Sequence, residues 1–468
     1  MNMNGRKKCL VLTFQTPQKP GGGGEVRSWC LLKTACEVFD VTILNIGGMT
    51  GSGRVPEEIR RNCAMVIEPV LEDSAPAAAR RTGRMAAWFS LVGALLFPWS
   101  DYGRPFLRLM LQYGLSQDRG VAATLVRIAV RFWTPVIALM PITCFMFDQS
   151  WRRIRDASIS LATRERFDIF WVEHTLAWPF AEQLLELPGI CDARIICSAQ
   201  NIEHMVCERQ RDVAVEAANA AYHDRQAKQM KRLELRAWRR ADLVLQCSEV
   251  DANETKRHVP GARVEVIGNG VDGQYFQPIA ATAANIEPLI LYTAGFGYAP
   301  NTEAVRWFLQ QVFPLVRQLM PQVRFLFAGS EAERFSEALA AEGAGLLDGV
   351  EWISDPPDIR PAFGRGLVYV VPLQCGGGSR LKILEAMSMR VPVVSTSVGA
   401  EGVPYEDGKH LLLADGAEAF AAAVVRLLQD AQLRQRLTEQ AAEFVREAWD
   451  WSTLCSQLRD VLQKEFCK

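Results

Sequence analysis

Short apolar runs alternate with amphipathic stretches along most of the chain, and the short runs predict β-strands. In the first half they are Cys9–Phe14, Val41–Ile46, Ile169–Val172, Ile195–Ser198 and Leu243–Gln246; in the second half they are Leu289–Thr293, Val323–Phe327, Leu367–Val371 and Val391–Thr396. Helical periodicity lies between them, as in Asn301–Leu319, Ser379–Met389 and Ala417–Leu428. Strands that alternate with helices form parallel sheets covered by helices, so the sequence predicts an α/β protein.

A turn and a Pro- and Ala-rich stretch separate the two sets of strands and predict a domain boundary. Val264–Asp272 ends a strand in an Asn-Gly turn, and the Pro- and Ala-rich stretch Pro278–Pro288 leads into the next strand. A chain of 468 residues is also long enough to form two hydrophobic cores. We therefore expect an N-terminal domain over residues 1–278, a C-terminal domain over residues 286–448 and a C-terminal helix over residues 449–468. One arrangement open to this helix is to pack back on the N-terminal domain.

Charge and cysteine content narrow the functional classes. The net charge of −1 argues against a nucleic-acid partner, because nucleic-acid-binding proteins usually carry a basic excess. The 12 cysteines are scattered without the Cys-x-x-Cys spacing of a zinc or redox site, so we expect reduced thiols in a cytoplasmic protein. The apolar run Cys9–Phe14 is too short for the core of a secretion signal.

Two uncharged stretches, Met85–Ser100 and Phe132–Phe147, form an apolar insertion at about residues 85–150 of the N-terminal domain. Each is shorter than the roughly 20 residues that a membrane-spanning helix needs. Arginines flank both stretches, which is typical of a helix lying in the plane of a membrane and would make the protein peripheral on the inner face of the cytoplasmic membrane. Buried core or a helical lid is the alternative interpretation, and the sequence leaves both open.

The motif with the clearest chemistry spans Pro372–Met387, where a buried strand is followed by three glycines and a helix. The glycines Gly376, Gly377 and Gly378 allow backbone N–H groups to approach an anion, and the helix N-terminus adds partial positive charge. Arg380 and Lys382 supply cations for a diphosphate, and Glu385 is placed to accept hydrogen bonds from ribose hydroxyls. The alternative is a glycine turn that caps a surface helix.

With these residues, the second half resembles the C-terminal domain of the group 1 (family 4-like) retaining glycosyltransferases of the GT-B fold. The motifs that carry the resemblance are Gly295–Asn301, Phe327–Gly329, the Gly-Gly-Gly-Ser-Arg-Leu-Lys-Ile-Leu-Glu-Ala-Met run, Val391–Thr396 and Gly399–Gly402. The first half matches more loosely, through its glycine loop, Gln200–His204 and Arg240–Val244. The resemblance implies two Rossmann-like domains facing a central cleft, with the acceptor on the N-terminal domain and the nucleotide sugar on the C-terminal domain.

The sequence departs from the family pattern in two places. The first of the family's two glutamates would stand at Gly377, and only the second, Glu385, is present, as in a glycine-rich subgroup of the family. We expect backbone N–H groups to replace the missing carboxylate. Gly268 stands where the family's linker commonly has proline, a change expected to affect hinge stiffness more than chemistry.

The resemblance also implies roles for individual residues. His174 follows a strand end, where the family has a histidine that contacts the donor sugar, so the implied catalytic residues are His174, Arg380 and Lys382. The implied donor-binding residues are Gly295, Gly376, Gly377, Gly378, Ser379, Arg380, Lys382 and Glu385. No Asp-x-Asp motif stands beside the donor elements, so we expect metal-independent catalysis, no metal ligands and no cofactor besides the nucleotide diphosphate sugar itself.

The acceptor side is expected to include the loop glycines Gly22, Gly23 and Gly24, for which a flexible strand-to-helix turn is the alternative. Asn201 and Glu203 either line this side of the cleft or cap the next helix. The basic segment His223–Arg240 is by default a solvated helix face, with contact to anionic lipid or to a lipid-diphosphate acceptor as the alternative.

The leading hypothesis is a retaining glycosyltransferase that acts in cell-surface polysaccharide, exopolysaccharide or glycolipid assembly, with a nucleotide sugar donor and a lipid-linked or saccharide acceptor. A non-catalytic nucleotide-sugar-binding scaffold is the alternative, motivated by Gly377. Another GT-B activity, such as an epimerase or phosphorylase, ranks last because the residues of those reactions are not recognisable.

Overall fold

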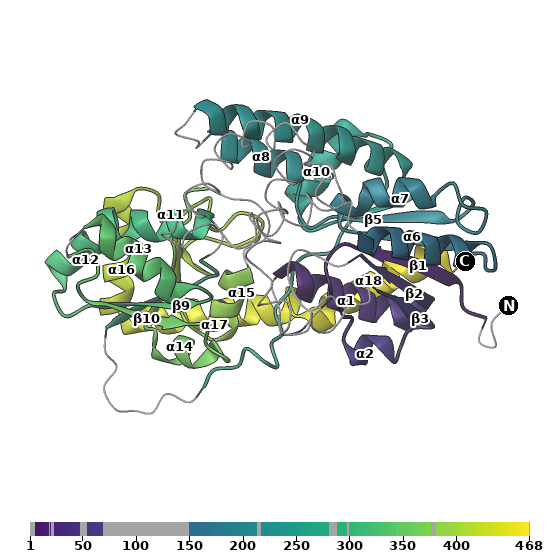
Figure 1. The fold of residues 1–468 in the computed structure, drawn as a ribbon. Helices are drawn as coiled ribbons and strands as arrows, with labels where there is room; N and C mark the ends of the chain where they lie inside the picture. The colour runs from purple at the N-terminus through teal and green to yellow at the C-terminus, as the bar shows by residue number, and fades with distance from the viewer. Residues whose placement is uncertain are drawn as a thin grey trace, which may run out of the picture.

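The computed structural model describes residues 5–17, 19, 23–46, 54–68, 149–212, 217–279, 288–296, 299–343, 345–375 and 381–467. It shows two α/β units side by side, with the N-terminal unit in purple and teal and the C-terminal unit in green and yellow (Figure 1). The predicted apolar stretches Met85–Ser100 and Phe132–Phe147 lie outside the described residues. Within the described ranges, no helix combines the length and apolar character needed to cross a membrane.

The first sheet has the strand order β3-β2-β1-β4-β5-β6-β7, and all its pairs are parallel. Its strands are β1 (Lys8–Thr13), β2 (Asp40–Asn45), β3 (Met65–Ile67), β4 (Ile169–Glu173), β5 (Arg194–Ser198), β6 (Leu243–Gln246) and β7 (Val264–Val266). The chain first builds outward from β1 to β3 and then returns beside β1 with β4. The order therefore reverses between β1 and β4, the type of position where open α/β sheets bind ligands.

The second sheet repeats this plan with the order β10-β9-β8-β11-β12-β13, again with parallel pairs. Its strands are β8 (Leu289–Thr293), β9 (Arg324–Gly329), β10 (Val350–Ser354), β11 (Val368–Val371), β12 (Val393–Ser395) and β13 (Leu412–Leu413). The order reverses between β8 and β11. The two sheets confirm the predicted α/β fold of two Rossmann-like units.

Helices cover both sheets (Figure 1). Those of the first half are α1 (Gly23–Val38), α2 (Glu57–Arg60), α6 (Gln149–Ala162), α7 (Trp178–Leu184), α8 (Glu203–Asp212), α9 (Ala217–Arg240) and α10 (Glu249–His258), with a 3-10 turn at Thr175–Ala177. Those of the second half are α11 (Ala299–Trp307), α12 (Phe313–Leu319), α13 (Ala332–Glu342), α14 (Arg360–Arg365), α15 (Leu381–Ser388), α16 (Ala417–Gln429), α17 (Ala431–Ala448) and α18 (Trp451–Phe466).

The segment Asn301–Leu319, predicted as one helix, is not uniform. Its central residues Phe308–Val312 form a π-helical turn between α11 and α12, just before Pro314. Proline has no backbone N–H, and its ring clashes with the preceding turn, so a locally wider turn lets the chain continue in helical form.

The C-terminal helix α18 crosses back to the first unit, so that the C-terminus lies near the N-terminal strand β1 (Figure 1). Its apolar residues Leu454, Leu458, Leu462 and Phe466 are buried in the core formed by α1 and the first sheet. Burying a leucine side chain stabilises a fold by roughly 1.5–3 kcal/mol. The helix therefore connects the two units a second time, in addition to the linker after β7.

The two connections touch each other at the crossing point. The backbone N–H of Val271 donates to the carbonyl of Trp449 at 2.9 Å, and that of Trp451 donates to the carbonyl of Val271 at 3.1 Å. Gly268 packs against the Trp449 ring so closely that a Cβ atom would lie 2.5 Å from it. The glycine at this linker position therefore allows the close approach of an aromatic ring, a packing role that the sequence did not predict.

Candidate functional site

The carboxyl ends of the strands of each sheet carry polar side chains beside the points where strand order reverses. In the first unit these are Glu173, the last residue of β4, and His174, which follows it, next to β1. In the second unit the same edge carries Gly295, whose backbone lies in the loop after β8, next to the Pro372–Cys375 loop after β11. Ligands of open α/β sheets bind outside such strand ends. These edges therefore define the candidate site.

His174 is held in one orientation at the end of β4. Its Nδ1 accepts a hydrogen bond from the backbone N–H of Leu176 at 3.2 Å, which leaves the proton of the neutral ring on Nε2. Burial lowers the pKa of His174 to about 4. Its backbone has a φ of 77°, a conformation that costs a non-glycine residue energy and is found most often at functional sites. His174 is therefore a neutral donor of one hydrogen bond through Nε2.

Glu173, on the preceding position, is fully buried and has a structural role. Its carboxylate accepts hydrogen bonds from Ser28 Oγ at 3.0 Å and from Trp171 Nε1 at 3.1 Å. Burial raises the pKa of Glu173, and the nearby Arg27 opposes that shift. Because Ser28 lies on α1, this carboxyl group ties the start of α1 to the end of β4.

The glycine loop brings α1 to the boundary between the two units; Gly22 lies outside the described residues. A Cβ atom at Gly24 would collide with the side-chain oxygens of Gln15 and Gln200. A Cβ atom at Gly23 would lie 2.7 Å from Cδ1 of Leu381, the first residue of α15 in the second unit. The N-termini of α1 and α15 thus meet at one place, and the partial positive charges of two helix ends favour an anion there.

Glu203 lies between His174 on one side and Asn201 on the other. The Oε1 atom of Glu203 is 3.8 Å from Nε2 of His174 and 3.5 Å from Nδ2 of Asn201. Burial, and then the charge of Glu234, raise the pKa of Glu203 to about 8, while Asn201 opposes the shift. At neutral pH this carboxyl group is mostly protonated.

The helix α8 is capped by a residue distant in sequence. The carboxylate of Glu234, on α9, accepts hydrogen bonds from the backbone N–H groups of Glu203 at 2.6 Å and His204 at 3.3 Å. The side chains of Glu203 and Asn201 face each other instead. Glu234 was not singled out in the sequence, because its role depends on a contact between helices.

Lys382 and Glu385 lie on α15 in the second unit. Lys382 Nζ donates hydrogen bonds to Tyr292 Oη and to Asn301 Oδ1, both at 3.0 Å, and Asn301 Nδ2 donates to the carbonyl of Gly295 at 2.9 Å. The ammonium therefore joins the start of α15 to the loop after β8. Burial raises the pKa of Glu385 to about 7, and the Lys382 charge opposes this shift.

The remaining predicted donor residues Gly376, Gly377, Gly378, Ser379 and Arg380 lie outside the described residues. The structure places both their flanks, Cys375 after β11 and Leu381 at the start of α15. They connect a strand end at the reversal point of the second sheet to a helix N-terminus.

A cavity of about 620 Å³ lies between the two units, within the size range of small-molecule sites. Arg209 on α8 closes one side of it through two hydrogen bonds of 2.6 Å to the carboxylate of Glu401 in the second unit. The cavity is lined by Arg209, Asp212, Gln374, Cys375, Ser397, Val398, Ala400, Glu401, Gly402, Val403 and Tyr405. The sequence did not reveal the Arg209–Glu401 pair, because the residues meet only when the units face each other.

Comparisons with known proteins agree with this arrangement. Residues 287–430 match the family model described as "Glycosyl transferases group 1", and residues 115–275 match "Glycosyltransferase Family 4".

Among curated proteins, the chain is 25% identical over 173 residues to an "Uncharacterized 44.6 kDa protein in cps region" of Klebsiella pneumoniae, a match that covers 36% of this chain and 44% of that protein. It is 30% identical over 159 residues to a phosphatidyl-myo-inositol mannosyltransferase of Mycobacterium leprae, covering 33% of this chain and 41% of that protein. It is 30% identical over 222 residues to a lipopolysaccharide core biosynthesis mannosyltransferase of Rhizobium leguminosarum bv. viciae, covering 44% of this chain and 60% of that protein. The first two matches thus span less than half the length of these relatives.

Among solved structures, the HepE protein of Anabaena in complex with UDP and glucose has a TM-score of 0.57 at 13% identity, with 98% of this chain and 100% of that chain covered. Sucrose-phosphate synthase from Thermosynechococcus elongatus has a TM-score of 0.65 at 16% identity, covering 99% of this chain and 100% of that chain. At such identity the likeness concerns the fold. Together with the two family-model matches, it shows that the chain has the GT-B fold, with a first unit similar to family 4 glycosyltransferases and a second unit similar to group 1 glycosyltransferases.

Proposed function

We propose that the protein is a retaining glycosyltransferase that moves a sugar from a nucleoside diphosphate sugar to an acceptor in cell-surface polysaccharide or glycolipid assembly. The observation that carries the proposal is the meeting of the N-termini of α1 and α15 between the two units. Two helix N-termini favour a diphosphate. Similar proteins support the substrate class, because they include two mannosyltransferases and a fold relative bound to UDP and glucose.

In this proposal the donor diphosphate lies against the N-terminus of α15, where the backbone of Gly376–Gly378 and the side chain of Arg380 would hold it. The positively charged ammonium of Lys382 is positioned by hydrogen bonds to the hydroxyl of Tyr292 and to the amide oxygen of Asn301. That charge and the helix ends would stabilise the negative charge that develops on the leaving diphosphate. Glu385 would accept hydrogen bonds from the ribose.

His174 would orient the donor sugar by donating a hydrogen bond from Nε2 to a sugar hydroxyl. It is not suited to be a general base at neutral pH, because its pKa is near 4 and its Nδ1 already accepts a backbone hydrogen bond. Glu203 is not suited to be a nucleophile either, because a carboxyl group with a pKa near 8 is mostly protonated at pH 7. Neither side chain would therefore act as a base or a nucleophile. Catalysis would depend on the donor phosphates and on electrostatic stabilisation of the leaving diphosphate.

The stereochemistry can be tested directly. Incubation of the protein with its nucleotide sugar and acceptor, followed by NMR of the product, should show the anomeric configuration of the donor retained. An inverted product would refute the retaining mechanism. Tight nucleotide-sugar binding without product, with native lipid extracts present as acceptor, would instead favour the non-catalytic scaffold that Gly377 motivates.

We also propose a lipid-linked or saccharide acceptor and a peripheral position on the inner face of the cytoplasmic membrane. The exposed basic residues Arg225, Lys228, Arg232 and Arg236 fall on one side of α9. Two of them have acidic partners, since Lys228 pairs with Asp224 and Arg236 with Glu182. Sedimentation with vesicles rich in anionic lipid tests this proposal. Recovery of all protein in the supernatant at low salt would contradict it.

A further inference from the structure

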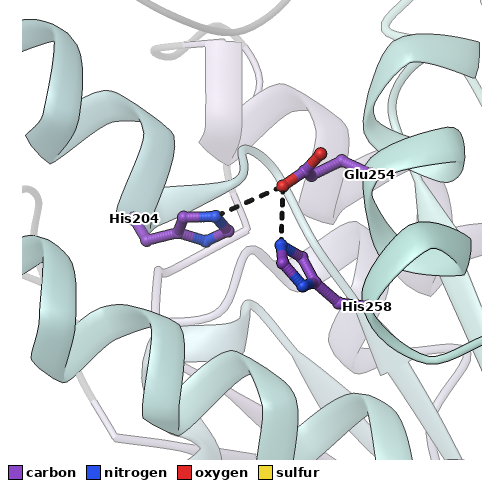
Figure 2. A group of neighbouring side chains, drawn as sticks. All are labelled: His204, Glu254 and His258. Atoms are coloured by element: carbon purple, nitrogen blue, oxygen red, sulfur yellow. Dashed lines mark hydrogen bonds and ion pairs between the residues drawn. The ribbon is translucent and has the colours of Figure 1, made fainter.

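Three side chains that offer metal ligands converge in the N-terminal unit (Figure 2). They are His204 at the start of α8, and Glu254 and His258 on α10. Their ligand atoms all lie within 4.8 Å of one another. Oε1 of Glu254 is 3.5 Å from Nε2 of His204 and 2.9 Å from Nε2 of His258.

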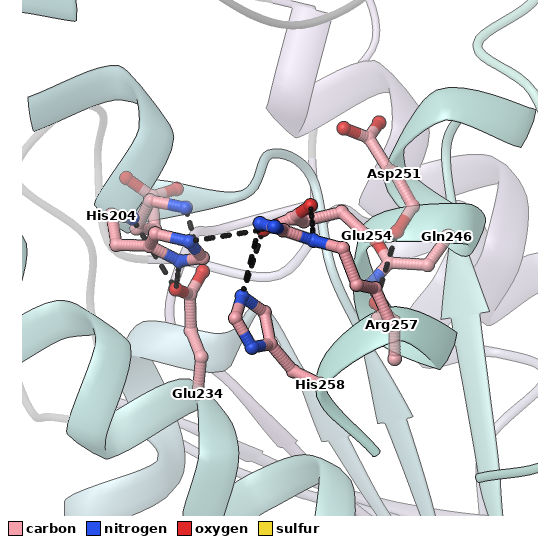
Figure 3. A network of polar contacts seen from close by, with 9 residues as sticks. His204, Glu234, Gln246, Asp251, Glu254, Arg257 and His258 are labelled. Atoms are coloured by element: carbon pink, nitrogen blue, oxygen red, sulfur yellow. Dashed lines mark hydrogen bonds and ion pairs between the residues drawn. The ribbon is translucent and has the colours of Figure 1, made fainter. Parts of the chain in front are cut away.

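The buried carboxylate of Glu234 orients the first of these ligands (Figure 3). His204 and Glu234 are almost completely buried, and Nδ1 of His204 lies 2.6 Å from Oε2 of Glu234. When the neutral ring of His204 donates its Nδ1–H to Glu234, the lone pair of Nε2 faces the Glu254 carboxylate. Two acceptors then face each other across 3.5 Å, and a cation between them would satisfy both. A histidine whose other nitrogen donates to a carboxylate is the usual arrangement around protein-bound zinc.

The other two ligands are held by their own helix. Glu254 and His258 are four residues apart on α10, so both side chains lie on the same face of that helix. The helix is fixed to the sheet, because Gln246 Nε2 donates to the Oγ1 of the buried Thr255 at 2.7 Å. The positions of the two ligands are therefore set before any ion binds.

We propose that His204, Glu254 and His258 bind one Zn²⁺ ion, with water as a fourth ligand and Glu234 as the residue that orients His204. Zinc bonds to nitrogen and oxygen of about 2.0–2.2 Å in a tetrahedral site require ligand atoms roughly 3.3–3.6 Å apart. The two separations that involve Glu254, 2.9 and 3.5 Å, are close to that geometry, and the ligand nitrogens of the two histidines lie within 4.8 Å of each other. Two imidazoles and one carboxylate with an open position form a ligand set well suited to zinc.

The guanidinium of Arg257 competes with the proposed ion for Glu254 and His258. Its Nε and Nη2 donate to the two carboxylate oxygens of Glu254 at 2.8 and 2.6 Å, and its Nη2 lies 3.3 Å from Nε2 of His258. Its side chain is 66% exposed, so it can turn toward solvent when an ion binds. The guanidinium therefore lowers zinc affinity without blocking the site.

The ion would join α8 to α10 and so stabilise one wall of the interdomain cavity. The helix α8 begins with Glu203, beside His174, and carries Arg209, which pairs with Glu401. The role is structural, since the donor residues Lys382 and Glu385 lie on α15 in the other unit.

The test uses the full chain without a polyhistidine tag, stripped of metal and titrated with Zn²⁺ against a chromophoric chelator. We expect one tight equivalent, and an affinity loss of at least roughly tenfold in His258→Ala, because even loss of an orienting residue costs about 10–100-fold. The control His223→Ala removes a histidine on α9 that is not among the three ligands and should leave affinity unchanged. Arg257→Gln should raise affinity. Zn²⁺ should raise the Tm of the wild type but not that of His258→Ala.

Three results would overturn the proposal. One is the absence of a tight equivalent in the wild type, and another is equal affinity in His258→Ala and the wild type. The third is a thiolate-to-metal charge-transfer band when Co²⁺ replaces Zn²⁺, because it would place the ion on cysteines. Both His258 and Arg257 retain contact with solvent, so these variants should fold, and circular dichroism checks that they do.

Discussion

The His174→Gln substitution tests whether this histidine is neutral in the folded protein. The pKa of His174 is lowered to about 4 by burial, whereas an unfolded histidine has a pKa of about 6.5. Below pH 6.5 the unfolded chain therefore binds a proton that the folded chain does not, and stability falls as the pH falls toward 4. Between pH 7.5 and 5.5 this difference should cost the wild type about 1.4 kcal/mol, since one pH unit corresponds to about 1.36 kcal/mol.

Glutamine cannot be protonated in this range, so His174→Gln should lack this loss. Urea unfolding of both proteins at pH 7.5 and 5.5 measures the difference, and comparison within the pair cancels the opposing contributions of Glu173 and Glu203, whose pKa values are raised. NMR of the imidazole protons adds a direct measure of the His174 pKa. Equal pH dependence in the two proteins, or a His174 resonance that titrates above pH 6, would refute the reasoning.

Three further substitutions or treatments follow from the site. Gly24→Ala should lower the free energy of unfolding by about 1–3 kcal/mol, because the added Cβ displaces Gln200. The control Gly261→Ala has open space around its Cβ and should change the Tm little in thermal unfolding. Lys382→Met should weaken nucleotide-sugar binding by about 1.5–3 kcal/mol, which is the contribution of a hydrogen bond to a charged group, and calorimetry measures this loss. Unchanged affinity would exclude Lys382 from the donor site. EDTA would remove the zinc proposed above, so the assay is run well below the Tm of the metal-free protein, where sugar transfer should stay intact; loss of turnover that Mg²⁺ restores would contradict metal-independent catalysis.

Much of the fold could be predicted from the sequence, because buried parallel strands are continuous apolar runs. The runs at Cys9–Phe14 and Leu289–Thr293 correspond to β1 and β8 within about one residue at each end. The edge strands β3, β10 and β13 were missed. The side chains of β3 and β10 are mostly only partly buried and lack a strong apolar pattern, and β13 has only two residues.

The sequence led to a candidate site only where the residues concerned are close along the chain. The residues of the Pro372–Met387 motif are adjacent along the chain, so their order alone indicated an anion site. The cap of α8 by Glu234, the interdomain pair of Arg209 with Glu401, and the approach of Gly23 to Leu381 all join residues far apart in sequence. Such contacts depend on how helices pack and on how the units face each other, which periodicity does not encode.

The same limit applies to the proposed zinc ligands. We expected no metal ligands, because the cysteines lack zinc-site spacing and no Asp-x-Asp motif is present. Glu254 and His258 have the four-residue spacing of two ligands on a helix, but the third ligand, His204, precedes them by a complete helix and strand. A search for pairs four residues apart would have found part of the cluster.

The central claim, a nucleotide sugar bound at the start of α15, is tested most directly by binding and slow hydrolysis across a panel of nucleotide sugars, with the wild type and Arg380→Ala compared. The account predicts that donors of one nucleobase bind and are slowly hydrolysed, and that both properties collapse in the variant while its fold is retained. If no nucleotide sugar binds the folded wild type, or if Arg380→Ala binds equally well, the donor site is not where we place it.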